Sequence, residues 1–177
     1  TLYFWPYCQG LEVFGSWFQQ LWAESLGKAL RRDGEPADNV AVPLASLGPR
    51  DQHSILQQVM EDVRPHWVWI LKNNRPDHEG PALKKSLFKE SGLRLGKTMN
   101  DLVLAQSEAT QSALIQNEIP TLTLSLDGIS PKTMSALLFL MEIVVGAIGE
   151  SMAIDAFNQP GVELGKKLAY SLLELKR

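Results

Sequence analysis

The sequence predicts an α/β fold in which a mainly parallel sheet of about four or five strands is flanked by helices. Two kinds of segment, and the way they alternate, predict it. Short apolar runs, typical of buried strands, alternate with longer segments in which apolar residues recur every three or four positions. This alternation is the pattern of βαβ units, whose strands pair in parallel and whose helices cover the sheet. With 177 residues, 45% of them hydrophobic, the chain is long enough for one domain with its own core.

The chain opens with a strand and a helix. The aromatic-rich run Leu2–Tyr7 predicts a buried strand. Apolar residues at three- and four-residue spacings then predict an amphipathic helix over Leu11–Leu30. Residues 31–39 are charged and contain a glycine and a proline, so we expect a loop there.

Two strands and a helix follow. Val40–Ala45 is apolar enough for a short strand, and Pro43 within it indicates a strand end or a sheet edge. Asp51 is a favourable N-cap for the next helix, because its carboxylate can accept a backbone N–H of the first turn. Trp67–Leu71 predicts a third strand.

The middle of the chain is predicted to be a polar loop and then a long helix. Residues 73–92 are mixed and polar, with a short helix expected over Pro81–Phe88. Thr98–Asn117 predicts a long helix. The spacing places Leu102, Ala105, Ala109 and Ala113 on one face of this helix.

The last third is predicted to hold one more strand and two helices. Thr121–Leu126 reads as a strand followed by an Asp-Gly turn. The helix over Lys132–Ile148 is apolar on most sides, so we expect it to be buried. The final helix begins at Pro160.

Composition narrows the functional classes. The net charge of −3 argues against nucleic acid or an anionic membrane surface as the main partner. The one cysteine, Cys8, excludes an internal disulfide and fits a reducing compartment such as the cytoplasm. Ala136–Ile148, the longest apolar run, is interrupted by Glu142 and is too short to span a bilayer. The chain lacks an initiator Met and shows no signal peptide, so we expect it to be part of a longer protein.

Glu24 and His53 are the first candidates for acid–base chemistry. Glu24 lies among apolar neighbours on the first predicted helix, where a carboxylate can serve as a carbon base. The alternative is a surface glutamate paired with Lys28 four residues on. His53 lies in the first turn of a helix that follows a strand, a common place for ligands in α/β sheets. The alternative is a polar first-turn residue without a role.

A third candidate region is the stretch from Phe157 to Lys166. It combines Asn158, Gln159 and Lys166 near a helix start, and this set of amides and a cation suits a polyhydroxylated anionic ligand. The alternative is a helix N-terminus with a surface pair between Glu163 and Lys167.

Other catalytic and metal-binding signatures are absent from the sequence. No spacing of histidine, cysteine and carboxylate residues suits zinc, and His66 and His78 are interpreted as structural or exposed. No glycine-rich dinucleotide or phosphate-binding loop and no serine-hydrolase motif is found.

Three segments together resemble one family, the glucose-6-phosphate isomerases. Their matching stretches are Gln20–Lys28, Gly48–Ser54 and Phe157–Lys166, in the family's order. The resemblance covers essentially the whole chain and implies a C-terminal sugar isomerase (SIS) domain over 1–177, with a flavodoxin-like three-layer sandwich and the N-terminal SIS domain missing.

The resemblance also implies roles for four residues. Glu24 would move a proton between C1 and C2 through an enediol intermediate, and Lys166 would assist ring opening and bind substrate oxygens. Gln159 would hydrogen-bond the substrate. His53 would help to open the sugar ring in the active site of the neighbouring subunit of a homodimer.

The implied reaction converts glucose 6-phosphate to fructose 6-phosphate in glycolysis and gluconeogenesis without metal or cofactor. In the family, the residues that hold the phosphate lie in the N-terminal half, so we expect this chain alone to be folded but inactive. Three alternatives remain open. They are a non-catalytic sugar-phosphate-binding module, a fusion with another sugar-phosphate enzyme, and an interaction domain that presents Trp5, Trp17 and Trp22.

Overall fold

The chain folds as two compact units in the computed structural model, which describes residues 1–76, 80–84 and 96–174. The first unit comprises Thr1–Gln19 and Ala41–Leu140, and the second comprises Gln20–Val40 and Met141–Arg177. Each unit contains buried apolar residues of its own.

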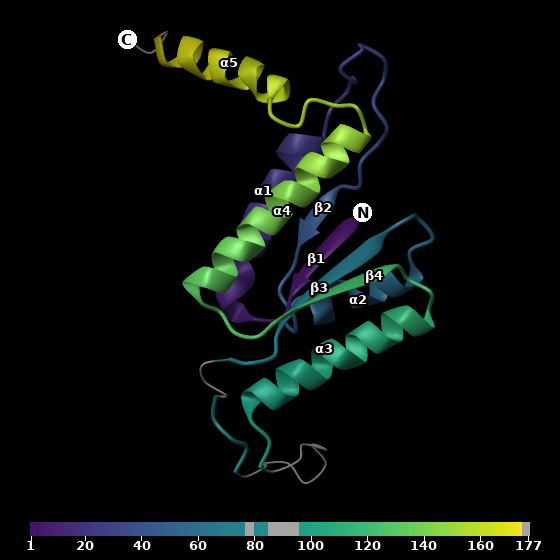
Figure 1. Cartoon of the computed structure of the whole chain (residues 1–177), viewed down its shortest axis with the longest axis vertical. Helices are drawn as coiled ribbons and strands as arrows, with labels where there is room; N and C mark the ends of the chain where they lie inside the picture. The colour runs from purple at the N-terminus through teal and green to yellow at the C-terminus, as the bar shows by residue number, and fades with distance from the viewer. Residues whose placement is uncertain (77–79, 85–95, 175–177) are drawn as a thin grey trace. The chain divides into compact units, whose positions relative to one another are not determined.

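A four-stranded parallel sheet forms the centre of the first unit (Figure 1). Its strands are β1 (Leu2–Pro6), β2 (Pro43–Ala45), β3 (Trp67–Asn73) and β4 (Thr121–Leu126), in the order β2-β1-β3-β4. The helical elements of this unit are η1 (Gln9–Leu11), the first part of α1 (Glu12–Leu26), α2 (Gln52–Glu61), α3 (Met99–Gln116) and the first part of α4 (Pro131–Ser151). The predicted α/β class with a parallel sheet is confirmed.

Side chains on the two faces of the sheet pack against different helices. On one face, Phe4 and Trp69 lie against Phe18 of α1, with ring centroids 4.3 Å apart for Phe4–Phe18 and 5.5 Å apart for Phe18–Trp69. On the other face, Tyr3, Trp5, Val68 and Ile70 pack with Val59 of α2 and Leu114 of α3. Neighbouring strand residues point to opposite faces, so β1 contributes to both. The result is the predicted arrangement of helix, sheet and helix layers.

The first helix and the second strand are several residues shorter in the structure than predicted. The first helix ends at Leu26 rather than Leu30, because the chain turns at Gly27. The second strand covers only Pro43–Ala45 of the predicted Val40–Ala45. It lies at the sheet edge, as Pro43 indicated, since a proline cannot donate to a second neighbouring strand.

The buried face of α3 differs from the face that the sequence spacing indicates. Thr98 caps this helix in a reciprocal pair with Asp101, so its start was predicted well. Its buried residues, however, are Ser107, Thr110 and Leu114, whereas Ala105 and Ala109 are exposed. A face that contains a serine and a threonine does not stand out in a hydrophobic pattern.

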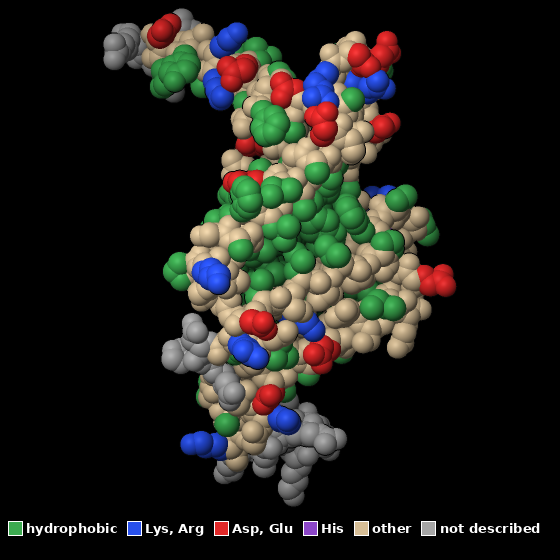
Figure 2. Space-filling view, viewed as in Figure 1, with side chains coloured by type: hydrophobic (Ala, Val, Ile, Leu, Met, Phe, Trp, Pro, Cys, Tyr) green, Lys and Arg blue, Asp and Glu red, His purple; other side chains and the backbone are tan. Residues whose placement is uncertain are grey.

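The expectation that α4 is buried on most sides is wrong. One stripe at four-residue spacing is buried and consists of Leu137, Met141, Val145 and Gly149. The neighbouring stripe is exposed and includes Leu138, Phe139, Leu140 and Ile143. Hydrophobic side chains gather over α4 on the visible face (Figure 2). The described part of the chain therefore covers only one side of this helix.

The apolar run Ala136–Ile148 was predicted to be too short to span a bilayer, but α4 as a whole is long enough. The helix has 21 residues and is the one helix in the described ranges that is long and apolar enough to cross a bilayer. Length and composition are weak evidence, because a core helix of a soluble protein passes the same test.

The predicted helix at Pro81–Phe88 is absent from the part of it that the structure describes, residues 81–84. Residues 81–84 are not helical, and Ala82 instead forms an isolated bridge with Thr98. The rest of that prediction, and His78, fall outside the described residues.

The second unit contains the end of α1, the end of α4 and the C-terminal elements η2 (Pro160–Val162) and α5 (Glu163–Glu174). Its buried apolar residues are Trp22, Leu26, Met141, Val145, Ile154 and Ala156. No residue of α5 is buried. The loop after α1 closes on itself through an antiparallel bridge between Leu30 and Pro36.

Candidate active site

Glu24 lies on the last turn of α1, and two amide side chains hold its carboxylate. Gln159 donates from Nε2 to Glu24 Oε2 at 2.7 Å, and Gln20 donates to Oε1 at 3.1 Å. Gln20 is one helical turn before Glu24, whereas Gln159 comes from the segment before η2. Neutral donors on both oxygens orient a carboxylate without neutralising its charge.

The alternative ion pair between Glu24 and Lys28 is not formed. Lys28 Nζ instead donates to the backbone carbonyl of Glu24 and to the backbone carbonyl of Asn158, each at 2.5 Å. Burial lowers the pKa of the Lys28 ammonium, although the carboxylates of Asp155 and Glu24 act in the opposite direction. The carboxylate of Glu24 therefore stays available for other chemistry.

Asp155 shapes the loop that delivers Gln159. Its Oδ1 accepts the backbone N–H of Phe157 at 3.0 Å, and its Oδ2 accepts the side-chain amide of Asn158 at 2.7 Å. This is an Asx turn, in which an aspartate side chain replaces a backbone acceptor. The amide of Asn158 is thus used within the loop, and Gln159 is the amide residue of this loop that reaches Glu24.

A pocket of about 870 Å³ opens beside Glu24 within the second unit. It is lined by Ala23, Glu24, Gly27, Lys28, Ala29, Leu30, Arg31, Arg32, Asp155, Asn158, Gln159, Pro160, Gly161 and Val162. Three cations, Lys28, Arg31 and Arg32, share this lining with two carboxylates. Arg32 pairs with Glu150 at 2.7 Å. The sequence interpretation placed both arginines in a charged loop and missed their position at this pocket.

Lys166 does not line the pocket. It lies on α5 and donates to Glu163 Oε1 at 2.8 Å, three residues earlier on the same exposed helix. The alternative interpretation expected Glu163 to pair with Lys167, whereas in the structure Glu163 pairs with Lys166. The structure brings Gln159 to Glu24 but does not bring Lys166 to the pocket.

His53 is the second residue of α2, in the first unit, and its side chain is exposed. The segment before it continues from the carboxyl end of β2, where Gly48 N donates to Pro6 O at 2.9 Å. Gly48 lies against Tyr7, because a Cβ there would come within 2.6 Å of the tyrosine ring. Glycine thus lets this segment pack closely on the end of β1.

Asp51 is the N-cap residue of α2, as predicted, although its side chain accepts no hydrogen bond from the first turn of the helix. Its Oδ2 accepts the backbone N–H of Leu47 at 2.7 Å. Arg50 donates to both oxygens of Asp51 and to Glu12 on α1. The hydrogen bond from Arg50 is the main reason that the pKa of Asp51 is lowered. The segment before His53 is therefore held by an ionic network as well as by backbone bonds.

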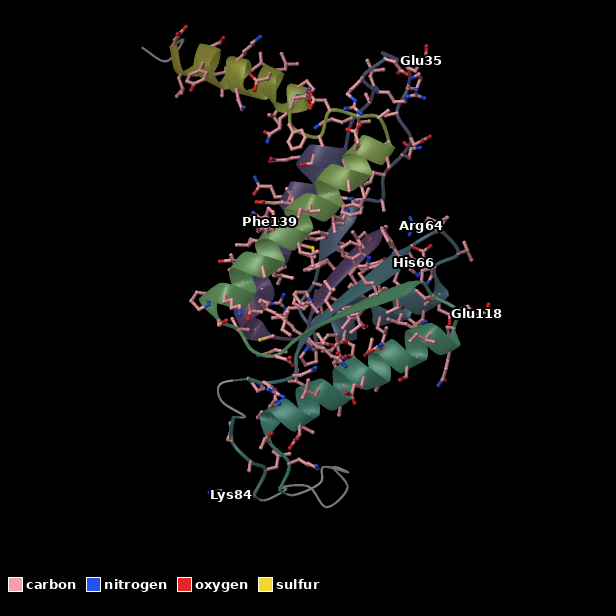
Figure 3. The ribbon with its side chains drawn as sticks, viewed as in Figure 1. Glu35, Arg64, His66, Lys84, Glu118 and Phe139 are labelled. Carbon is pink, nitrogen blue, oxygen red and sulfur yellow. The ribbon has the colours of Figure 1, made fainter. Side chains whose placement is uncertain are left out.

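His66 lies at the amino end of β3 (Figure 3), away from the strand ends where ligands bind in α/β sheets. Its ring packs edge-on against Tyr3, with centroids 5.9 Å apart, and Nδ1 lies 2.8 Å from Arg64 O. This agrees with a structural role. No group of three or more histidine, cysteine, aspartate or glutamate residues suited to a metal occurs within 1–76, 80–84 and 96–174.

Comparison with known proteins decides the family. The family model for phosphoglucose isomerase matches residues 1–176. The chain belongs to the phosphoglucose isomerase family. The glucose-6-phosphate isomerase of Carboxydothermus hydrogenoformans is 35% identical over 176 residues, which cover 95% of the chain and 36% of that relative. The chain thus spans about a third of the length of the curated relatives that it matches, from 31% to 39%.

Two solved structures share the fold of this phosphoglucose isomerase family member. A protein of Thermus thermophilus described as hypothetical superposes with a TM-score of 0.85 at 30% identity, over 97% of this chain and 41% of that one. A glucose-6-phosphate isomerase from Chlamydia trachomatis superposes with a TM-score of 0.83 over 99% of this chain and 35% of that one. At 22% identity, the second supports the fold alone.

Proposed function

We propose that the chain is the C-terminal SIS domain of an aldose–ketose isomerase that interconverts glucose 6-phosphate and fructose 6-phosphate. Membership of the phosphoglucose isomerase family supports this function. The single observation that carries it is the contact between Gln159 and Glu24 at the edge of the pocket. The enzyme acts in the cytoplasm, in glycolysis and gluconeogenesis.

Glu24 is the proposed base. Its carboxylate accepts the proton from C2 of the open-chain aldose and returns it to C1, while a second proton moves from the O2 hydroxyl to O1. The intermediate between the two carbon transfers is an enediol, and the product is the ketose. Such a transfer needs a carboxylate held in one orientation beside the reacting carbons. The amide donors from Gln20 and Gln159 supply that orientation.

The other proposed roles surround this base. Gln159 hydrogen-bonds a substrate hydroxyl with the amide that lies next to Glu24. Lys166 binds substrate oxygens and assists ring opening, which requires it to leave Glu163. His53 opens the ring in the partner subunit of a homodimer, a role compatible with its exposed side chain. The residues that bind the phosphate belong to the N-terminal half of the enzyme.

Substitution of Glu24 by glutamine in the full-length enzyme tests the proposal. The new amide keeps an oxygen that accepts from Gln159 but cannot take a proton from carbon. We expect kcat to fall by about 10²-fold or more, the size of a typical acid–base contribution. Binding of a sugar-phosphate analogue should stay nearly unchanged, and exchange of deuterium at substrate C2 should be lost.

Glu142→Gln is a matched control, because Glu142 is an exposed carboxylate on α4 away from the pocket lining. Its kcat should equal that of the wild type. A fall in kcat of less than about tenfold in Glu24→Gln would exclude Glu24 as the base.

A further inference from the structure

Lys28 follows the end of α1, where the helical hydrogen-bond pattern stops. Gly27 N donates to Ala23 O at 3.1 Å, and a Cβ on Gly27 would lie only 2.6 Å from that carbonyl oxygen. Lys28 N then donates to Leu26 O at 2.8 Å. After this turn the Lys28 side chain reaches back to the last turn of the helix, where its ammonium donates to Glu24 O.

The ammonium of Lys28 joins two segments that are far apart in the chain. The last carbonyls of a helix lack partners within the helix, and a lysine near the helix end can satisfy them. Lys28 donates to one of these, Glu24 O, and also to Asn158 O, 130 residues away. Both distances are 2.5 Å. One side chain therefore fastens the loop before η2 to the end of α1.

The two backbone positions that Lys28 joins lie at or next to the residues whose side chains meet at the pocket. Glu24 supplies one carbonyl to Lys28 and its carboxylate to Gln159. Asn158, which supplies the other carbonyl, directly precedes Gln159. The backbone clamp and the contact between Gln159 and Glu24 thus connect the same two segments.

The charge of Lys28 suits this role better than a role in binding substrate. Half-buried and with two backbone acceptors, its ammonium is already engaged in the free protein. Burial lowers its pKa, but the neighbouring carboxylates of Asp155 and Glu24 favour the charged form. The other charged groups that line the pocket around it are Arg31 and Arg32.

From these contacts we infer that Lys28 is a positioning residue, which holds the Asn158–Gln159 segment on α1 so that Gln159 orients the Glu24 carboxylate. The inference rests on the proposed isomerase function. In this role Lys28 needs no contact with the substrate or with the transferred proton. It acts through the backbone of the two segments that carry Glu24 and Gln159.

Lys28→Met in the full-length enzyme removes the ammonium and keeps the aliphatic stem. We expect kcat for fructose 6-phosphate to fall by about tenfold to a hundredfold, because small displacements of a catalytic group have effects of this size. Lys28→Arg keeps a cation with several donors and should restore a large part of kcat. Lys132→Met, at an exposed position on α4, is the matched control and should leave kcat unchanged.

A double-substitution cycle with Gln159→Leu separates positioning from a general effect on folding. If Lys28 acts through Gln159, the loss of kcat from Lys28→Met should largely disappear in the Gln159→Leu background. An equal loss in both backgrounds, or a kcat for Lys28→Met within twofold of the wild type, would overturn the inference. So would a loss in Lys28→Met that Lys28→Arg does not relieve at all.

The Glu24→Gln enzyme distinguishes this inference from the proposed function. If Glu24→Gln retains its kcat, the isomerase assignment of Glu24 fails and Lys28 has no base to position. If Glu24→Gln loses its kcat while Lys28→Met keeps it, only the role of Lys28 fails. If kcat falls in both variants and the effect of Lys28→Met depends on Gln159, the proposed function and the role of Lys28 are both supported.

Discussion

Gly149, near the end of α4, offers a sharp test of how the loop with Gln159 is placed. A Cβ on Gly149 would lie 2.7 Å from Ala156 Cβ, about 1 Å short of ordinary carbon–carbon contact. The backbone carbonyl of Gly149 also accepts Ile154 N at 3.0 Å. Gly149→Ala must therefore push the segment around Ala156, just before Gln159, away from the helix.

This displacement sets the expected changes in the free energy of unfolding and in kcat. Overpacking of this kind costs about 1–3 kcal/mol, and alanine regains about 0.5–1 kcal/mol over glycine in a helix. The net loss in the free energy of unfolding should be about 0.5–2 kcal/mol by the same two effects. A shift of about 1 Å in the residues around Glu24, the proposed base, can lower kcat by about 10²-fold.

Gly146→Ala is a close control, because it lies one turn earlier on α4 and a Cβ there would meet no atom within 4 Å. It should raise the free energy of unfolding by about 0.5–1 kcal/mol and leave kcat unchanged. Both variants are compared in the full-length enzyme by urea denaturation and by steady-state kinetics with fructose 6-phosphate. Equal stability of the two variants, with kcat of Gly149→Ala within twofold of the wild type, would refute the reasoning.

Two further predictions concern the isolated chain and the segment before His53. The purified 177-residue chain should fold but show no isomerase activity, and activity should appear only when the N-terminal half is added; appreciable conversion of fructose 6-phosphate by the chain alone would contradict this. Because Arg50 lowers the pKa of Asp51, the ionised carboxylate stabilises the folded state above its unfolded pKa near 4, and this contribution is lost as the pH falls through the lowered value. The difference in unfolding midpoint between the wild type and Asp51→Asn should thus be largest above about pH 4 and should shrink in stronger acid; a difference that grows on acidification would contradict the assignment.

The sheet was predictable because its strands carry strong local signals. Thr121–Leu126 was predicted with the bounds observed for β4, since a proline precedes this apolar run and Asp127-Gly128 follows it. Leu2–Tyr7 was recognised from its aromatic residues, which occupy both faces of the sheet. Such runs specify a strand without knowledge of the neighbours, although only β1 of these two strands is buried.

Helix faces were harder to predict, because they depend on what the rest of the chain covers. The sequence pattern for α4 shows apolar residues on most sides. Among the described residues, however, only the stripe through Leu137 and Met141 is buried. On α3, the sheet side includes Ser107 and Thr110, which a count of hydrophobic residues passes over. Tertiary packing decides both cases.

The candidate site was only partly accessible from the sequence. The family resemblance selected Glu24 and Gln159, which are 135 positions apart and hydrogen-bonded in the structure. It gave no sign of Lys28, whose spacing from Glu24 indicated an ordinary surface pair. The carbonyl acceptors that define its role belong to the backbone, and they come together only when the turn at Gly27 is formed.

The discontinuous composition of the second unit has a consequence for biosynthesis. Its pocket needs residues 20–40 and the segment after Met141, and the whole of 41–140 lies between them in the chain. At ribosomal rates of about 5–20 residues per second, the end of α1 must wait on the order of ten seconds for its partner loop. Trp22 and Leu26, which are buried in the finished unit, remain uncovered by that loop during this time. The nascent chain therefore presents an unfinished apolar surface late in translation, and chaperones that bind such surfaces have their opportunity before the loop with Gln159 emerges.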